Sequence, residues 1–340
     1  MKRHIKQNHK QKNGQYFTAS ANTLLKDFAF VVKDKHVIDP FAGAGHLTDW
    51  AISCGAASIS KYDIEPITAD TIKNDSILMP PCFTNKVLIT NPPYLSRNKS
   101  KNKTLYEAWN QDDLYKCHLA ALCESDLQEG IIIIPSNFLC EARAKARNLF
   151  FEHFKIIKVK YFQEQIFEDA TTGVIIMHFK RGSGTSQFEI IYYPNGDTEN
   201  VSLEKKYKWI HGKDFFDYIV SKRTMKINNI VLGDNKTSNS NIVISLLDGS
   251  KRGLCAYYNE GVPHRTAPKA FTTYQIYFED ETRLSEEQER KIVTLYNKKL
   301  NEFRKQYHSM FLSNYMGATQ KIKSRSYSYK LLERCIQEIV

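Results

Sequence analysis

Short apolar runs alternate with amphipathic stretches through the first half of the chain. The apolar run over residues 87–89 stops at Asn91-Pro92-Pro93, which indicates the carboxyl end of a buried strand because prolines cannot continue a central ladder. Helical spacing of apolar positions predicts a helix over residues 22–32. Further strands are expected at residues 36–39, 58–62, 130–135, 156–162 and 173–179, with a second helix over 141–151. This alternation favours an α/β fold with an open sheet.

The second half of the chain follows a stretch of linker-like composition at residues 181–186. Strands are expected at 187–193 and 241–247, and residues 202–220 are mixed. Residues 285–307 predict a long charged helix that Ser285 and Gln288 open with a capping box, and 328–340 predict a terminal helix. With 340 residues and 42% hydrophobic content, the chain can bury two cores. We therefore expect two domains, residues 1–182 and 183–340.

Positive charge is concentrated in a few segments. The formal net charge is +11 and the sequence pI is about 9.1, which favours a polyanionic partner. Residues 1–12 form a basic arm without acidic residues, and residues 97–103 form a basic loop directly after the Asn-Pro-Pro turn. A solvated surface or a flexible end is the alternative explanation of each basic segment.

The cysteines and the hydropathy exclude several classes of protein. The seven cysteines contain no CxxC pair and no regular spacing, so we expect reduced thiols without a disulfide framework or a metal site. No apolar run approaches the length of a membrane span, and the N-terminus lacks the apolar region of a signal peptide. We expect a soluble, cytoplasmic protein.

A glycine turn followed by an acidic residue suggests a nucleotide-like ligand. Gly43 and Gly45 follow the strand at 36–39 and open a helix, where backbone N–H groups approach a ligand closely. Asp63 lies 18 residues after Gly45, at the end of the second strand, where a carboxylate accepts hydrogen bonds from a ribose diol. A carboxylate that caps its own loop is the alternative. Asp75 is a further candidate acceptor, for an adenine amino group.

The tetrapeptide Asn91-Pro92-Pro93-Tyr94 presents two acceptors and a ring. The prolines fix the backbone, so the Asn91 amide and the Pro92 carbonyl are held rigidly, with Tyr94 close by. A substrate with an amino group and a flat ring suits this arrangement. The alternative is an ordinary Pro-rich turn after a strand.

Five motifs in one order carry a family resemblance. The segments Gly14–Thr18, Asp39–Gly45, Tyr62–Pro66, Asn74–Ser76 and Asn91–Tyr94 are similar to those of the γ class of DNA adenine-N6 methyltransferases from restriction-modification systems, over roughly residues 13–180. The resemblance implies S-adenosylmethionine as cofactor and a Rossmann-like class I methyltransferase sheet, mostly parallel, with seven strands of which the last is antiparallel. It also implies a mixed α+β target-recognition domain at the C-terminus, and a prokaryotic or viral origin. Ala19 departs from the family, which often has proline there.

The resemblance also assigns roles to residues. It implies catalytic roles for Asn91, Pro92 and Tyr94, and stacking of a flipped adenine between Tyr94 and Phe167. Packing of Phe167 in the core is the alternative. The implied cofactor-binding residues are Tyr16, Thr18, Asp39, Phe41, Gly43, Gly45, Asp63, Ile64 and Asp75. The basic residues that we expect to contact DNA are Arg97, Lys99, Lys101, Lys103, Lys251, Arg252, Arg265, Lys321, Lys323 and Arg325.

The predicted function is methyl transfer to N6 of a flipped adenine in double-stranded DNA, within a type II restriction-modification system. A separate cognate endonuclease that acts on the same site is a possible partner. Two alternatives stay open: methylation of RNA or of protein glutamine, and a catalytically silent DNA-binding module. The early cofactor loop with a long region after it disfavours the glutamine enzymes, and the intact Asn91, Gly43 and Gly45 disfavour a silent copy.

Overall fold

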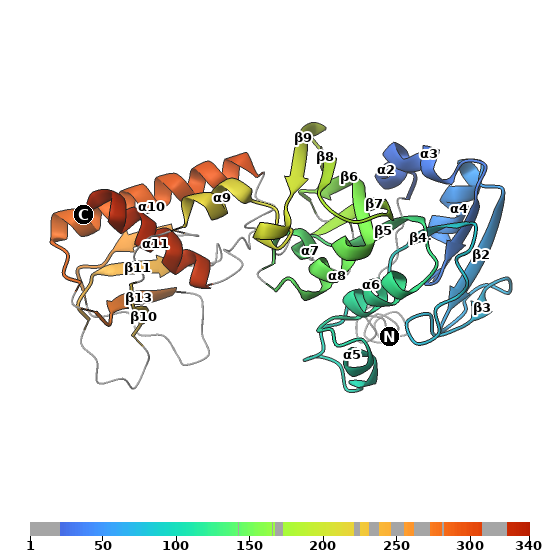
Figure 1. The fold of residues 1–340 in the computed structure, drawn as a ribbon, viewed down its shortest axis with the longest axis horizontal. Coiled ribbons are helices and arrows are strands. Elements are labelled where there is room, and N and C mark those ends of the chain that lie inside the picture. The colour runs from blue at the N-terminus through green and yellow to red at the C-terminus, as the bar shows by residue number, and fades with distance from the viewer. Residues whose placement is uncertain are drawn as a thin grey trace, which may run out of the picture. The chain divides into compact units, whose positions relative to one another are not determined.

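The computed structural model describes residues 21–141, 143–164, 166, 173–220, 225–230, 238–245, 255–261, 273–280, 282–307 and 325–340. The chain forms two compact units (Figure 1). The first unit ends at Trp209, and the second takes in residues 140–142 and the chain from Ile210 onward. None of the described helices is long and apolar enough to span a membrane.

A single nine-stranded sheet organises the first unit, in the order β3-β2-β1-β4-β5-β7-β6-β8-β9. Strands β1 to β5 pair in parallel, and β7 runs antiparallel between β5 and β6. The strands are β1 (His36–Asp39), β2 (Ser58–Asp63), β3 (Ile72–Lys73), β4 (Lys86–Thr90), β5 (Glu129–Pro135), β6 (Phe154–Phe162), β7 (Val174–Arg181), β8 (Ser186–Tyr193) and β9 (Asp197–Leu203). The expected large, mostly parallel sheet is confirmed, with two more strands than expected.

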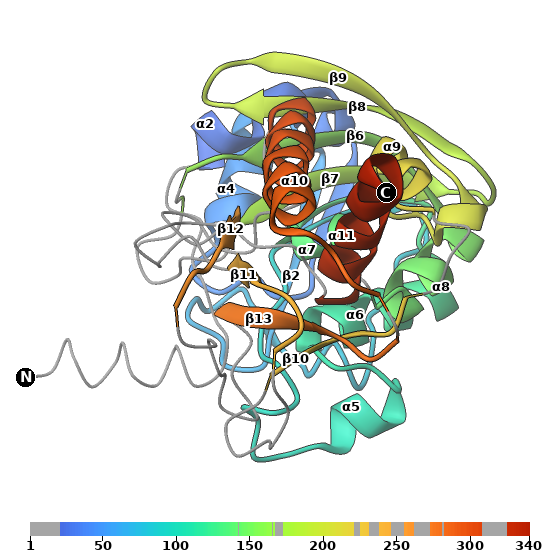
Figure 2. The ribbon, with the colours of Figure 1, turned by 90° about the vertical axis from the view of Figure 1, so that its left-hand side faces the viewer.

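The two additional strands change where the first unit ends. β8 pairs in parallel with β6, and β9 pairs antiparallel with β8, so both extend the sheet as a long hairpin (Figure 2). The linker-like stretch at residues 181–186 therefore joins two strands of one sheet and separates no compact units. The first unit runs to Trp209 instead of ending at residue 182, because strand pairing, which composition does not reveal, holds residues 186–203 on the sheet.

Short helices accompany this sheet. They are α2 (Ala21–Leu25), η1 (Lys26–Phe28), α3 (Ala29–Val32), α4 (His46–Ser53), α5 (Thr104–Ala108), α6 (Leu114–Glu124), α7 (Asn137–Cys140) and α8 (Lys145–His153), with η2 (Lys205–Tyr207) after β9. The helix predicted over residues 22–32 is interrupted by the 3₁₀ turn η1. The centre of the core is β5, whose four isoleucines at 131–134 are fully buried. An apolar run without alternation is typical of a strand covered on both faces.

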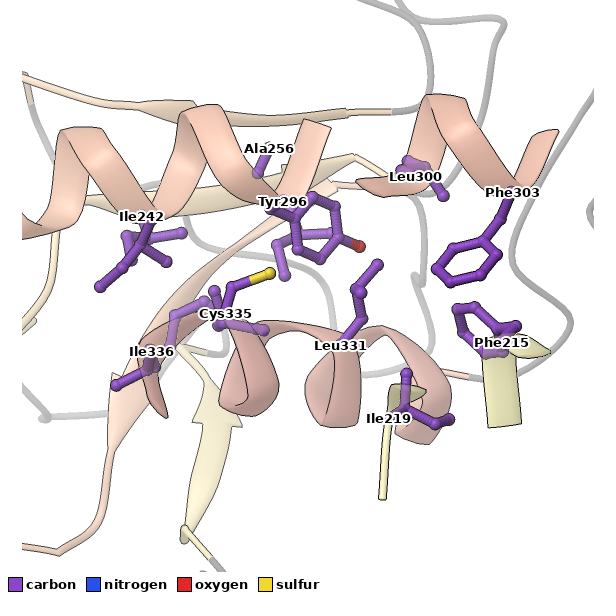
Figure 3. Close-up of a cluster of buried hydrophobic side chains, with 14 of the residues drawn as sticks. Phe215, Ile219, Ile242, Ala256, Tyr296, Leu300, Phe303, Leu331, Cys335 and Ile336 are labelled. Carbon is purple, nitrogen blue, oxygen red and sulfur yellow. The ribbon is translucent and has the colours of Figure 1, made fainter. Parts of the chain in front are cut away.

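The second unit packs helices against a four-stranded antiparallel sheet in the order β10-β13-β11-β12. Its elements are α9 (Lys213–Tyr218), β10 (Ile227–Asn229), β11 (Ile242–Ser245), β12 (Cys255–Tyr258), β13 (Thr273–Phe278), α10 (Glu286–Gln306) and α11 (Arg325–Ile339). Ser285 and Gln288 form the predicted capping box of α10. Tyr296 and Leu300 of α10 point toward Leu331 and Cys335 of α11 in one buried cluster (Figure 3).

Candidate active site

The strand order of the large sheet reverses between β1 and β4. From β1 the chain proceeds outward to β2 and β3, and from β4 it proceeds outward on the other side to β5. In open α/β sheets, the crevice beside such a reversal, at the carboxyl ends of the strands, is where ligands bind. The segments that follow β1, β2 and β4 contain most of the residues singled out in the sequence.

A buried carboxylate joins β1 to β4. Asp39, the last residue of β1, is fully buried. Its Oδ1 accepts hydrogen bonds from the Phe41 N–H at 3.0 Å and from the Thr90 hydroxyl at 2.8 Å. Its Oδ2 has no hydrogen-bond partner among the residues that the structure describes. Burial raises the pKa of the Asp39 carboxyl to about 7. An unpaired buried oxygen beside the glycine turn suits a polar ligand there.

The glycine turn after β1 is held by the acid at the end of β2. Gly43 has φ of 52° and Gly45, which precedes α4, has φ of 87°, both in the region that favours glycine. The Gly43 N–H donates to Asp63 Oδ2 at 2.8 Å, and the Glu65 N–H donates to Asp63 Oδ1 at 2.8 Å. Burial raises the pKa of Asp63, while these two bonds lower it. Asp63 therefore caps its own loop, as in the alternative to ribose binding given in the sequence analysis. Each of its carboxylate oxygens still has a further lone pair that can accept from a ligand.

Two further predicted cofactor residues lie on neighbouring loops. Ile64 exposes 50% of its side chain, so it is available to a planar ring. Asp75 follows β3, and its Oδ1 accepts from the N–H groups of Ile77 and Leu78, each at 3.2 Å. The main-chain bond from Asn74 N–H to the Asp63 carbonyl, 2.9 Å long, keeps this loop beside the end of β2.

The Asn-Pro-Pro-Tyr segment directly follows Thr90 at the end of β4. Asn91 is half-buried, whereas Pro92 and Tyr94 are buried. The Tyr94 hydroxyl lies within hydrogen-bonding distance of Asn91 Oδ1 and donates to the Ile133 carbonyl at 2.7 Å. The Tyr94 ring also meets the Tyr115 ring edge-on, with centroids 6.1 Å apart. Because Thr90 binds Asp39, the structure brings this segment next to the glycine turn.

The sequence reasoning missed a residue that anchors the other end of this segment. Asp113, just before α6, accepts the Leu95 N–H at 3.1 Å, and the Leu114 N–H donates to the Leu95 carbonyl at 3.1 Å. Burial raises the pKa of Asp113 to about 7. The sequence signal for Asp113 was an acidic residue directly before a helical pattern. That signal does not reveal its partner Leu95, which lies 18 residues earlier in the chain.

A second missed residue is His118 of α6. Its side chain is 1% exposed, and neither ring nitrogen has a hydrogen-bond partner in the described part of the chain. The ring meets Phe41 of the glycine turn edge-on, with centroids 4.7 Å apart. Burial lowers the pKa of His118 to about 3, so the imidazole is neutral at physiological pH.

The basic loop divides into two pairs of residues. The Lys103 ammonium donates to the carbonyls of Arg97 and Ser100, and Arg97 pairs with Glu107 at 2.9 Å. Lys99 and Lys101 are exposed. Lys103 and Arg97 thus have structural contacts within the loop region, while Lys99 and Lys101 are accessible to a partner.

Several predicted site residues lie outside the described residues: Tyr16, Thr18, Phe167, Lys251, Arg252, Arg265, Lys321 and Lys323. Arg325 is the first residue of α11. In the described ranges, no three His, Cys, Asp or Glu side chains are grouped so as to hold a metal ion. All seven cysteines are free thiols.

Comparison with known proteins identifies the segment around the tetrapeptide. Residues 85–167 match the model of the Eco57I restriction-modification methylase family. The matched segment includes β4, Asn91, Tyr94, Asp113 and His118. A search of curated proteins found no match.

Solved structures resemble a larger part of the chain at low identity. A modification subunit of a putative type I restriction enzyme from Vibrio vulnificus is 12% identical, with a TM-score of 0.43, over 64% of this chain and 55% of that one. The type IIG restriction endonuclease BpuSI is 15% identical, with a TM-score of 0.44, over 72% of this chain and 39% of that one. The type IIL enzyme MmeI, solved in complex with DNA, is 11% identical, with a TM-score of 0.40, over 72% and 43%. The alignments thus span 39–55% of the length of these proteins.

Proposed function

We propose that the protein transfers a methyl group from S-adenosylmethionine to N6 of an adenine flipped out of double-stranded DNA. We further propose that it is the modification enzyme of a type II restriction-modification system, with a cognate endonuclease acting separately on the same site. The observation that supports methyl transfer best is the position of Asn91-Pro92-Pro93-Tyr94. This segment directly follows Thr90, which binds Asp39 at the reversal of the strand order.

Asn91 and Pro92 supply the acceptors for the substrate amino group. The lone pair of adenine N6 is delocalised into the ring, so the group is a weak nucleophile. When Asn91 Oδ1 and the Pro92 carbonyl accept its two hydrogens, the nitrogen moves toward tetrahedral geometry and its lone pair becomes available. Positioning and electrostatic stabilisation suffice for this step, without a general base.

The residues after β1, β2 and β3 fit the cofactor. S-adenosylmethionine, when bound, supplies a methyl group activated by a positively charged sulfur. Asp39 Oδ2, which lacks a hydrogen-bond partner among the described residues, lies beside the glycine turn, and the left-handed backbone at Gly45 lets a ligand approach the turn closely. We assign the ribose to Asp63, the adenine ring to Ile64 and the cofactor amino group to Asp75. The remaining proposed cofactor contacts are Tyr16, Thr18, Phe41 and Gly43.

DNA binding follows from the basic segments and from the need to extrude the base. N6 of a stacked adenine cannot reach a buried site, so the base must flip out at a cost of a few kcal/mol. We assign the stacking that offsets part of this cost to Tyr94 and Phe167. Lys99 and Lys101 are the exposed candidates for phosphate contact. We assign target recognition to the second compact unit.

Parallel labelling of DNA, RNA and protein with a radioactive methyl donor tests the proposal, followed by mapping of methylated adenines. Incorporation into DNA at adenine N6 is expected, and Asn91→Ala should abolish it while S-adenosylmethionine still binds. Asn195→Ala is the matched control, because Asn195 is exposed in the turn between β8 and β9. Label only in RNA or protein, or full activity of Asn91→Ala, would refute the proposal.

A further inference from the structure

Two aromatic side chains at α5 bond to two different segments of the candidate site. The Tyr106 hydroxyl donates to the Leu95 carbonyl at 2.9 Å, and Leu95 directly follows the Asn-Pro-Pro-Tyr tetrapeptide. The indole N–H of Trp109, the residue after α5, donates to the Ile77 carbonyl at 3.0 Å. Ile77 lies in the loop after β3, two residues beyond Asp75. One short helix therefore holds both the substrate segment and a cofactor segment of the proposed function.

The bond from Trp109 reaches the backbone that fixes Asp75. The Ile77 N–H donates to Asp75 Oδ1 at 3.2 Å, while the carbonyl of the same residue accepts from Trp109. Strand β3, which precedes this loop, is only two residues long, lies at the edge of the sheet and is exposed. An exposed strand of this length holds the following loop weakly, since it buries little apolar surface. A displacement of Trp109 would therefore move Ile77 and with it the Asp75 carboxylate.

Tyr106 acts on the tetrapeptide through the residue that follows it. The Leu95 carbonyl also accepts from the Leu114 N–H at 3.1 Å, and the Leu95 N–H donates to Asp113 at 3.1 Å. The Tyr106 side chain is 1% exposed, so its hydroxyl cannot easily exchange this bond for one to water. The position of α5 is thereby transmitted to the backbone directly after Tyr94.

A small apolar cluster joins these two connections. Ile77 and Tyr106 are buried in it together with Cys117 of α6. Trp109 packs against this cluster, and so does Phe41 of the glycine turn. Side chains packed at the density of a protein interior cannot shift independently of one another. The segments that follow β1, β3 and β4 are thus connected through α5.

We propose that Tyr106 and Trp109 are positioning residues that set the distance between the methyl group of the cofactor and the amino nitrogen of the substrate. This inference rests on the proposed function and deepens it, since that proposal assigns contacts with each reactant but names no element that holds the two together. Direct displacement needs reacting atoms about 3–3.5 Å apart, and a misplacement of about 1 Å can cost about 100-fold in rate. Neither side chain has to touch a reactant, because each acts through the main-chain carbonyl that it binds.

The first test removes the hydroxyl of Tyr106. Tyr106→Phe keeps the ring, and the Leu95 carbonyl keeps its bond from the Leu114 N–H, so the fold should survive. We expect the single-turnover methylation rate to fall about 10-fold, with the Kd of S-adenosylmethionine unchanged. Tyr192→Phe is the matched control, because it removes the hydroxyl of a fully buried tyrosine that donates to Glu199 in the hairpin of β8 and β9. The control should keep the wild-type rate, and a wild-type rate in Tyr106→Phe would overturn the inference.

The second test removes the indole N–H of Trp109. Trp109→Phe should release the Ile77 carbonyl and with it the loop that contains Asp75. We expect the Kd of S-adenosylmethionine to rise about 3- to 10-fold and the single-turnover rate to fall about 10-fold, with KM for DNA unchanged. Benzothienylalanine at position 109 has sulfur in place of the N–H and keeps the shape of the indole, so it covers the case in which Trp109→Phe folds poorly. Wild-type Kd and rate with this isostere would overturn the inference.

The double variant distinguishes one connecting element from two separate contacts. If α5 links the two segments, loss of either bond already breaks the link. The double variant of Tyr106→Phe and Trp109→Phe should then lose little more rate than the slower single variant. Two independent contacts would instead multiply their losses, to about 100-fold, and that result would overturn the inference while the proposed function stands. Absence of methylation by the wild-type protein on DNA, RNA and protein would refute the proposed function itself.

Discussion

Thr90 donates its hydroxyl proton to Asp39 Oδ1 over 2.8 Å, and this bond joins the two strands between which the strand order reverses. Both side chains are fully buried. The bond places the start of the Asn-Pro-Pro-Tyr segment beside the glycine turn. It also leaves Asp39 Oδ2 facing a low-dielectric interior without a partner among the described residues.

Asp39→Asn should stabilise the protein at high pH. Burial raises the Asp39 pKa from 3.8 to about 7. Below pH 3.8 the carboxyl is protonated in both states. As pH rises toward 7, the unfolded chain loses this proton and the folded chain keeps it, so the free energy of unfolding falls. The total fall is on the order of 4 kcal/mol once the pH is above both pKa values. The asparagine variant should gain about 1–3 kcal/mol in free energy of unfolding at pH 8. Urea denaturation at pH 4 and pH 8 measures this, and a gain independent of pH would contradict it.

His118→Leu should stabilise the protein most at low pH. The folded-state pKa of His118 is lowered from 6.5 to about 3. As pH falls below 6.5, His118 binds a proton in the unfolded chain but stays neutral in the folded chain. The free energy of unfolding therefore decreases progressively down to pH 3. Leucine removes this loss, and it also removes a buried imidazole that has no hydrogen-bond partner in the described part of the chain. We expect a gain of about 1–3 kcal/mol at pH 8 and about 2 kcal/mol more at pH 5.

Urea denaturation at the two pH values checks the prediction for His118. His36→Leu is the matched control, because it removes one imidazole from an exposed position. The gain in stability should be larger for His118→Leu than for His36→Leu at both pH values. Equal stabilisation by His118→Leu at pH 5 and pH 8 would show that His118 takes up a proton in the folded protein.

Local chemistry made much of the sheet predictable. The prolines after residue 90 mark the end of β4, and Gly43 and Gly45 mark the turn after β1, because each signal depends on the backbone of the residue itself. The capping box of Ser285 and Gln288 is local in the same way. Signals of this kind located the strand ends at which the candidate site lies.

Contacts between distant residues could not be predicted in this way. Thr90 is an ordinary strand residue until Asp39, 51 positions earlier, is placed beside it. That His118 has no hydrogen-bond partner among the described residues becomes apparent only once α6 packs near Phe41. Likewise, Gly182 and Gly184 have the composition of a linker, but pairing of β8 with β6 keeps the following residues on the sheet. These contacts could not be predicted because the residues that make them lie far apart in the sequence. The hydrophobic pattern of the strands and helices themselves was clear.

Gly45→Ala should weaken cofactor binding more than its cost in stability explains. Gly45 has φ of +87°, and an added Cβ would lie 3.4 Å from Thr48 Oγ1. Gly196→Ala is the matched control, since Gly196 has φ of +79° in the turn between β8 and β9 and nothing within 4 Å of its added Cβ. Both variants should lose about 1–2 kcal/mol of stability from left-handed strain. Only Gly45→Ala should raise the Kd of S-adenosylmethionine, measured by calorimetry. An equal Kd for both variants would show that the glycine turn does not contact the cofactor.

Replacing Lys99 and Lys101 together by alanine should weaken DNA binding equally on all sequences. Both side chains are exposed in the basic loop after the tetrapeptide, and each phosphate contact contributes about 0.9 to the slope of log K against log salt. The slope should therefore fall by up to about 1.8 in the double variant. Replacing Lys33 and Lys35, exposed at the amino end of β1, removes the same charge from a site remote in the fold and should leave the slope unchanged.

Lys103→Ala should behave differently, because Lys103 ties the loop to itself through the carbonyls of Arg97 and Ser100. Without these bonds the backbone around Lys99 and Lys101 gains conformational freedom. DNA binding must then order those residues, and the entropy lost weakens the binding. We expect weaker binding together with faster amide hydrogen exchange over residues 97–103 in the free protein. The Lys99 and Lys101 double variant should leave that exchange unchanged. Fluorescence anisotropy across a salt series and exchange measured by mass spectrometry separate the two effects, and an unaltered salt slope in the double variant would show that this loop does not contact DNA.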